Sequence, residues 1–168
     1  MTPPLRLVTG LLAGALVGAV LGFLIGGGVV FGRSLVADLW RPEGGFSIVL
    51  ENGARIAAIV GRLFALPAAI GGGVAGLVAF RPGRKTTFGR RPGVVGPAVT
   101  GLVVAALAAP AGLGLYASEV LGPVAGRAGA LPLFVLLRAA VLCGVAGLLA
   151  GLAVGRLAAG PARGTRLR

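Results

Sequence analysis

The sequence predicts an all-α integral membrane protein built as a bundle of four transmembrane helices. Hydrophobic residues make up 57% of the 168 residues and charged residues only 12%. The mean hydropathy is +0.99, which is typical of membrane proteins rather than soluble domains. No charge falls between Leu7 and Gly32, a run longer than the roughly 20 residues that cross a bilayer. Three further apolar runs follow, so we expect residues 1–168 to form a single membrane domain.

The first span, at about residues 7–32, has glycine at every fourth position. This glycine row consists of Gly10, Gly14, Gly18, Gly22 and Gly26. Positions four apart share one helix face, so the row forms a bare strip that lets another helix approach closely. Coding bias could enrich glycine, but it does not explain the strict spacing. A signal peptide would have an apolar region of only about 7–15 residues, so we interpret the run as a retained span.

The other apolar runs predict spans at about residues 56–80, 94–116 and 133–157. Prolines inside the second and third runs predict bent helices. Small residues again recur at every fourth position, as Gly61, Ala65, Ala69 and Gly73 in the second run and as Ala139, Cys143, Gly147, Gly151 and Gly155 in the fourth. These rows predict glycine-zipper packing of the first span against the fourth, or against another copy of the chain, with a crossing of about −40°.

The connections between the spans differ in charge. Residues 33–55 form the longest one, and its arginines are balanced by acids. We expect an external loop there, with Trp40 as an interfacial anchor and a β-prone stretch at 46–50. Residues 81–93 form a basic cytoplasmic loop and residues 158–168 a basic tail. Because cytoplasmic segments carry the excess of lysine and arginine, we expect both termini to be cytoplasmic.

Two short motifs recur in the same order along the chain. Val8-Thr9-Gly10-Leu11 returns as Val99-Thr100-Gly101-Leu102, and Gly73–Leu77 returns as Gly144–Leu148. One interpretation is a tandem duplication of a helical hairpin in the same orientation. The other is chance similarity, because glycine, alanine, valine and leucine dominate every apolar run.

The sequence lacks the side chains that most catalytic and metal sites need. It contains no histidine, and its four acidic residues all lie in the predicted connections. Cys143 is the only cysteine, which excludes an internal disulfide. No nucleophile–base set can be assembled from these residues. We therefore expect no enzyme activity, no cofactor and no metal.

Arg62 and Arg138 are exceptional because each lies about two turns inside an even-numbered span. An arginine at membrane depth is costly and is a candidate functional residue. One interpretation is that both side chains snorkel to the lipid headgroups. The other is that they pair with Glu51 or Glu119, or bind an anionic lipid or a carboxylate of a partner.

The net charge of +12 is concentrated in the basic loop and the basic tail. Four residues of the loop are candidate contacts with anionic headgroups, namely Arg84, Lys85, Arg90 and Arg91. The simpler interpretation is that they only set the topology. Aromatic residues are not interleaved with these charges, so we expect no nucleic-acid partner.

Because the sequence lacks the side chains of catalytic and metal sites, two hypotheses for the function are left. The first is a non-enzymatic accessory or scaffold subunit of a prokaryotic-type plasma (inner) membrane, assembled by glycine-zipper packing into a homo-oligomer or a larger complex. The second is a small oligomeric transporter or channel, because duplicated hairpins, bent spans and intramembrane arginines occur in transporters. Both predict a multi-pass protein in contact with the lipid bilayer.

Overall fold

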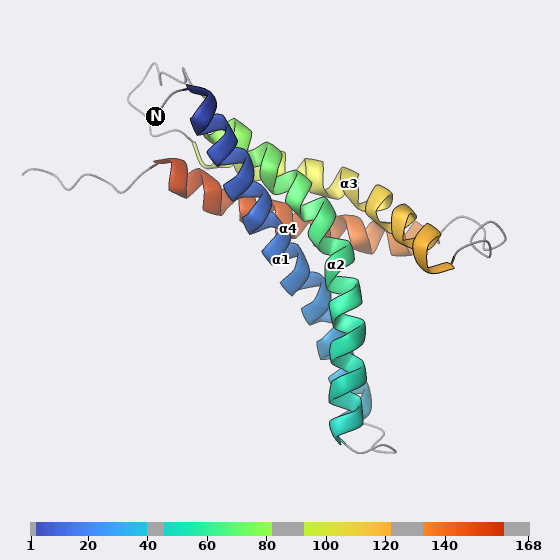
Figure 1. Ribbon diagram of the computed structural model, residues 1–168. Coiled ribbons are helices and arrows are strands. Elements are labelled where there is room, and N and C mark those ends of the chain that lie inside the picture. The colour runs from blue at the N-terminus through green and yellow to red at the C-terminus, as the bar shows by residue number, and fades with distance from the viewer. Residues whose placement is uncertain (1–2, 40–45, 82–92, 122–132, 160–168) are drawn as a thin grey trace, which may run out of the picture.

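The computed structural model describes residues 3–39, 46–81, 93–121 and 133–159 (Figure 1). It contains four α-helices, α1 (Pro3–Leu39), α2 (Phe46–Ala79), α3 (Val95–Leu121) and α4 (Leu133–Ala159). No strand occurs in these ranges. The prediction of an all-α chain with four helices is therefore confirmed.

All four helices are long and apolar enough to cross a membrane. The longest, α1, has 37 residues, which corresponds to a length of about 55 Å. The hydrocarbon core of a bilayer is only about 30 Å thick. The 27 residues of α4 give about 40 Å, so α1 is much longer than α4.

The connection between the first two helices is shorter than the external loop expected at 33–55. Helix α1 continues to Leu39 and α2 begins at Phe46, so the β-prone stretch is helical. The hydroxyl of Ser34 donates a hydrogen bond of 3.1 Å to the carbonyl oxygen of Val30, which lies one turn earlier in α1. A Cβ atom on Gly53 would lie 3.6 Å from that of Ser34. The two helices are thus in contact at this level, and helix formation through residues 46–50 overrides the local β-propensity.

The helices form two antiparallel hairpins, α1–α2 and α3–α4. Helices α2 and α4 each contact the other three helices, whereas the described parts of α1 and α3 do not contact each other. Figure 1 shows that the hairpins converge near the N-terminal end of α1 and splay apart toward its other end. Helix α2 changes direction along its length (Figure 1), and it contains Pro67, which removes one backbone donor from the helix.

The interior of the bundle consists mainly of glycine and alanine. Every buried residue of α1 whose side chain is described is a glycine. The largest fully buried side chains are only Val154, Pro67, Pro97 and Cys143. Large aliphatic side chains lie outside, for example Leu16, which is 67% exposed, and Leu107, which is 75% exposed. Small residues inside and large apolar residues outside are the pattern expected of helices that pack in lipid.

Candidate functional site

The glycine row of α1 packs against α2. A Cβ atom on Gly10 would lie 2.7 Å from the carbonyl oxygen of Gly76. On Gly14 and Gly18 a Cβ atom would overlap the carbonyl oxygens of Gly72 and Ala68, respectively. The helix backbones therefore touch directly, in the geometry in which Cα–H groups face opposing carbonyl oxygens. Any side chain added at these positions would force the helices apart.

The same row continues along α1 under a larger side chain of α2. A Cβ atom on Gly22 would overlap the carbonyl oxygen of Phe64, and one on Gly26 would lie 2.6 Å from Cδ2 of the Phe64 ring. An aromatic ring thus lies against each end of the row, since a Cβ atom on Gly10 would also lie 2.8 Å from Cδ2 of Phe80. Between these ends, at Gly14 and Gly18, backbone meets backbone.

This arrangement corrects the predicted pairing of the glycine row with the fourth span or with another copy. The row is occupied by α2 of the same chain. Short connections favour packing between consecutive helices, and the link between α1 and α2 spans only residues 40–45. The face of α2 is also displaced by one residue from the predicted row of Gly61, Ala65, Ala69 and Gly73. The residues of α2 against the glycine row are Phe64, Ala68, Gly72 and Gly76.

The small row of α4 packs against α3. Added Cβ atoms on Gly147 and Gly151 would overlap the carbonyl oxygens of Gly101 and Pro97, respectively. A Cβ atom on Gly155 would lie 3.1 Å from Cγ1 of Val94. The other two residues of the row, Ala139 and Cys143, are buried in a cluster with Ala105 and Ala109 of α3. The prediction that this row packs against the first span is therefore wrong, because the row of α4 is occupied by α3, its neighbour in the chain.

The two recurring motifs make matching contacts. Gly10 meets Gly76 in the first hairpin, and the corresponding residues Gly101 and Gly147 meet in the second. The hydroxyl of Thr9 donates to the carbonyl oxygen of Leu5 at 2.8 Å. The hydroxyl of Thr100, at the corresponding position, donates to that of Gly96 at 2.9 Å. Both threonines therefore bond their own helix, which is a structural role.

The interior offers no polar group to a substrate. Within the described parts of the four helices no buried side chain is polar or charged. Cys143 is a free thiol with only 1% exposure, and a buried cysteine behaves as a small apolar residue. No group of three potential metal-ligating side chains occurs in the residues that were described. The helix contacts that are described are thus made by apolar side chains and by backbone.

Arg62 and Arg138 are both exposed at the surface of the bundle. Arg62 cannot pair with Glu51, because eleven residues of helix α2 separate them by about 16 Å along the axis. The side chain of Glu119 lies outside the described residues. Arg62 and Arg138 also do not occupy corresponding positions in the two hairpins. In the register set by the Gly76 and Gly147 contacts, Arg138 corresponds to the buried Pro67.

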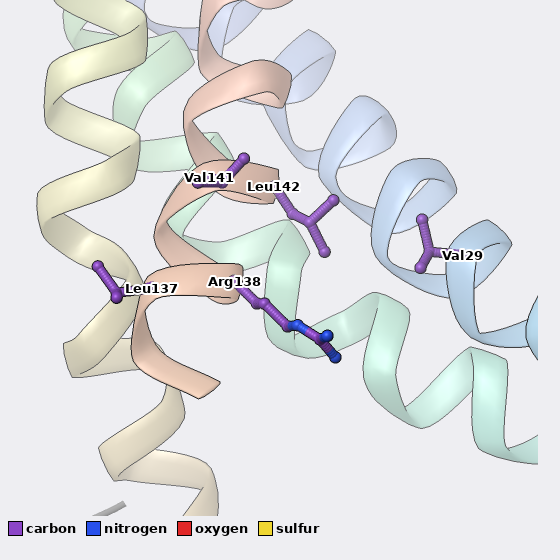
Figure 2. A pocket seen from close by; sticks show the side chains of 5 residues that line it. All are labelled: Val29, Leu137, Arg138, Val141 and Leu142. Carbon is purple, nitrogen blue, oxygen red and sulfur yellow. The ribbon is translucent and has the colours of Figure 1, made fainter. Parts of the chain in front are cut away.

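Arg138 borders a groove between the two hairpins. Figure 2 shows its side chain extending from α4, with Val29 of α1 across the gap. The groove has a volume of about 390 Å³ and is lined by Val29, Leu137, Arg138, Val141 and Leu142. All of these except Leu142 are exposed. We name this feature the α1–α4 groove. Sequence reasoning singled out Arg138 but not the apolar residues around it, since they depend on how far the hairpins splay.

Several predicted contact residues lie outside the described residues. These are Trp40 and the four basic loop residues Arg84, Lys85, Arg90 and Arg91. Their predicted contacts with the interface and with anionic headgroups stay predictions. No protein-family model, no curated protein and no solved structure matches this chain.

Proposed function

We propose that the protein is a non-enzymatic accessory or scaffold subunit of a membrane, with the plasma (inner) membrane of a prokaryotic-type cell as its location. The observation that supports this best is the closed interior. Helix backbones meet at Gly14 and Gly72 in one hairpin and at Gly101 and Gly147 in the other. The described part of the interior has no polar side chain with which to bind or convert a substrate.

The function then depends on the outer surface. The small rows of α1 and α4 are both used inside the chain, which leaves large aliphatic side chains to face neighbours. Such a surface can contact lipid or the apolar flank of another membrane protein. A homo-oligomer, if it forms, would therefore use a different face from the glycine row.

The proposed topology places both termini in the cytoplasm, because the basic loop and the basic tail would then lie on the cytoplasmic side. We also propose that the two hairpins are tandem repeats of the same orientation. The matching contacts of Gly10 with Gly76 and of Gly101 with Gly147 support this proposal. Exchange of the hairpins also preserves the contacts between helices, since α2–α3 corresponds to α4–α1.

The test is purification from membranes in a mild detergent, followed by reconstitution into liposomes. A scaffold subunit should co-purify with one defined membrane partner in a fixed ratio, or form one defined oligomer. The same sample should give no flux of small anions or cations above that of empty liposomes. Flux from the purified protein alone would overturn the scaffold proposal and favour the alternative of a small oligomeric transporter or channel.

A further inference from the structure

The two contacts between the hairpins differ although they occupy corresponding places. On one side, Pro67 of α2 is fully buried, and a Cβ atom on Gly112 of α3 would lie 2.8 Å from Cγ of that proline. On the other side, the residue of α4 that corresponds to Pro67 is Arg138, which is exposed. The residue of α1 that corresponds to Gly112 is Leu21. The larger residues Arg138 and Leu21 thus stand at the places of the proline and the glycine. The α1–α4 groove lies beside Arg138, whereas Pro67 and Gly112 are in contact on the other side.

We propose that the α1–α4 groove binds one anionic phospholipid, with the phosphate at the Arg138 guanidinium and an acyl chain along the apolar wall. This site does not depend on the proposed scaffold function. The wall is built by Val29, Val141 and Leu142, which offer only hydrocarbon. The volume of about 390 Å³ lies within the roughly 300–1,000 Å³ of ordinary ligand pockets.

The charge of the site favours an anion. Helix α4 contains no acidic residue, and α1 contains none before Asp38. Arg33 follows Val29 by one turn and therefore shares its face of α1. Arg33 does not line the groove, but it adds a positive charge to this face of α1, one turn beyond Val29. A guanidinium forms bidentate hydrogen bonds with phosphate, which gives this anion an advantage over a zwitterionic headgroup.

The depth of Arg138 also suits a lipid phosphate. It is five residues after Leu133, where α4 begins, and this separation corresponds to about 8 Å along the helix axis. A helix of about 40 Å extends beyond both sides of a hydrocarbon core of about 30 Å, so the guanidinium can reach the headgroup layer. The acyl chain would then lie deeper, beside Val141 and Leu142.

The experiment measures the preference of the reconstituted protein for spin-labelled phosphatidylglycerol over spin-labelled phosphatidylcholine. The host bilayer is phosphatidylcholine, and electron paramagnetic resonance gives the fraction of motionally restricted label. We expect Arg138→Gln to lower the preference for phosphatidylglycerol about fivefold, as expected for the loss of one basic contact. Arg138→Lys should retain most of the preference, because the positive charge remains.

The matched control is Arg62→Gln, which removes the same charge from an exposed arginine of α2 that does not line the groove. It should change the preference less than about twofold. A second variant, Val141→Trp, fills the groove without changing any charge. Since Val141 is 63% exposed, this substitution should fold, and it should lower the preference as Arg138→Gln does. Helical circular dichroism and elution volume identify variants that fold.

Four results would overturn the proposal. An unchanged preference in Arg138→Gln would exclude the arginine as the ligand of the phosphate. Equal losses in Arg138→Gln and Arg62→Gln would mean general attraction to a cationic protein. An unchanged preference in Val141→Trp would exclude the groove, and this readout remains if Arg138→Gln does not fold. A dimer that dissociates in Arg138→Gln would make a second copy the occupant.

Discussion

The two hairpins solve the same packing problem with different residues. In α1–α2, every buried position of α1 whose side chain is described is a glycine, from Gly10 to Gly27. In α3–α4, direct backbone contact is confined to the end near Gly101 and Gly147. Toward the other end, the small side chains of Ala105 and Cys143 fill the space between the helices.

This difference indicates which helix contacts can tolerate a substitution. A backbone contact has no side chain that can rotate away, so an added carbon atom must displace a whole helix. A contact through alanine and cysteine can lose or exchange an atom at the cost of a small cavity. The second hairpin should therefore respond more gently than the first near Ala105 and Cys143, whereas near Gly101 and Gly147 both hairpins should respond to small insertions of volume.

The largest effect is expected from Gly14→Leu. The new side chain would enter the space occupied by the carbonyl group of Gly72, and we expect a loss of more than about 3 kcal/mol in the free energy of unfolding. The matched control is Gly28→Leu in the same helix, where a Cβ atom would meet nothing within 4 Å. Thermal unfolding in detergent, followed by circular dichroism, measures both. Equal destabilisation by the two substitutions would contradict the α1–α2 packing described above.

A smaller loss in the free energy of unfolding should distinguish the two hairpins when corresponding positions are changed. Gly72 in α2 corresponds to Cys143 in α4, and both can be changed to alanine. Gly72→Ala adds a carbon that would overlap the carbonyl oxygen of Gly14, and we expect it to cost about 1–3 kcal/mol. Cys143→Ala only removes a buried sulfur atom and should cost about 1 kcal/mol.

Denaturation in mixed micelles, monitored by far-ultraviolet circular dichroism, gives both free energies on one scale. The comparison of the hairpins fails if Cys143→Ala is as destabilising as Gly72→Ala. It is sharpened if Gly147→Ala, whose Cβ atom would overlap the carbonyl oxygen of Gly101, destabilises the protein about as much as Gly72→Ala.

The smallest effect is expected from Gly32→Ala. Nothing lies within 4 Å of a Cβ atom at this position of α1, so only helix propensity changes. Alanine is favoured over glycine in a helix by about 1 kcal/mol at most. We expect the unfolding temperature of the variant to be equal to or slightly above that of the parent protein. A clear decrease in the unfolding temperature would mean that the end of α1 contacts something outside the α1–α2 hairpin.

The sequence predicts the helices and their small faces, because both follow from local patterns. Long apolar runs predict the four helices, and the four-residue spacing places Gly10 to Gly26 on one face. The partner of that face could not be predicted, since each span has a row of the same kind. The splay of the hairpins, which creates the groove beside Arg138, depends on contacts such as Pro67 with Gly112. Such a contact joins residues that are far apart in the sequence, and neither residue belongs to a repeating sequence pattern that would predict the contact.

The length of the first hairpin has a consequence for its place in a bilayer. Its first helix exceeds the hydrocarbon thickness by about 25 Å, and mismatch of this size is relieved by tilt or by projection into water. The charges of this hairpin are concentrated between Arg33 and Arg55, with Arg62 further along α2, which favours projection of the hairpin tip. The last turns of α1 and the first turns of α2 would then stand above the headgroups, outside the hydrocarbon core.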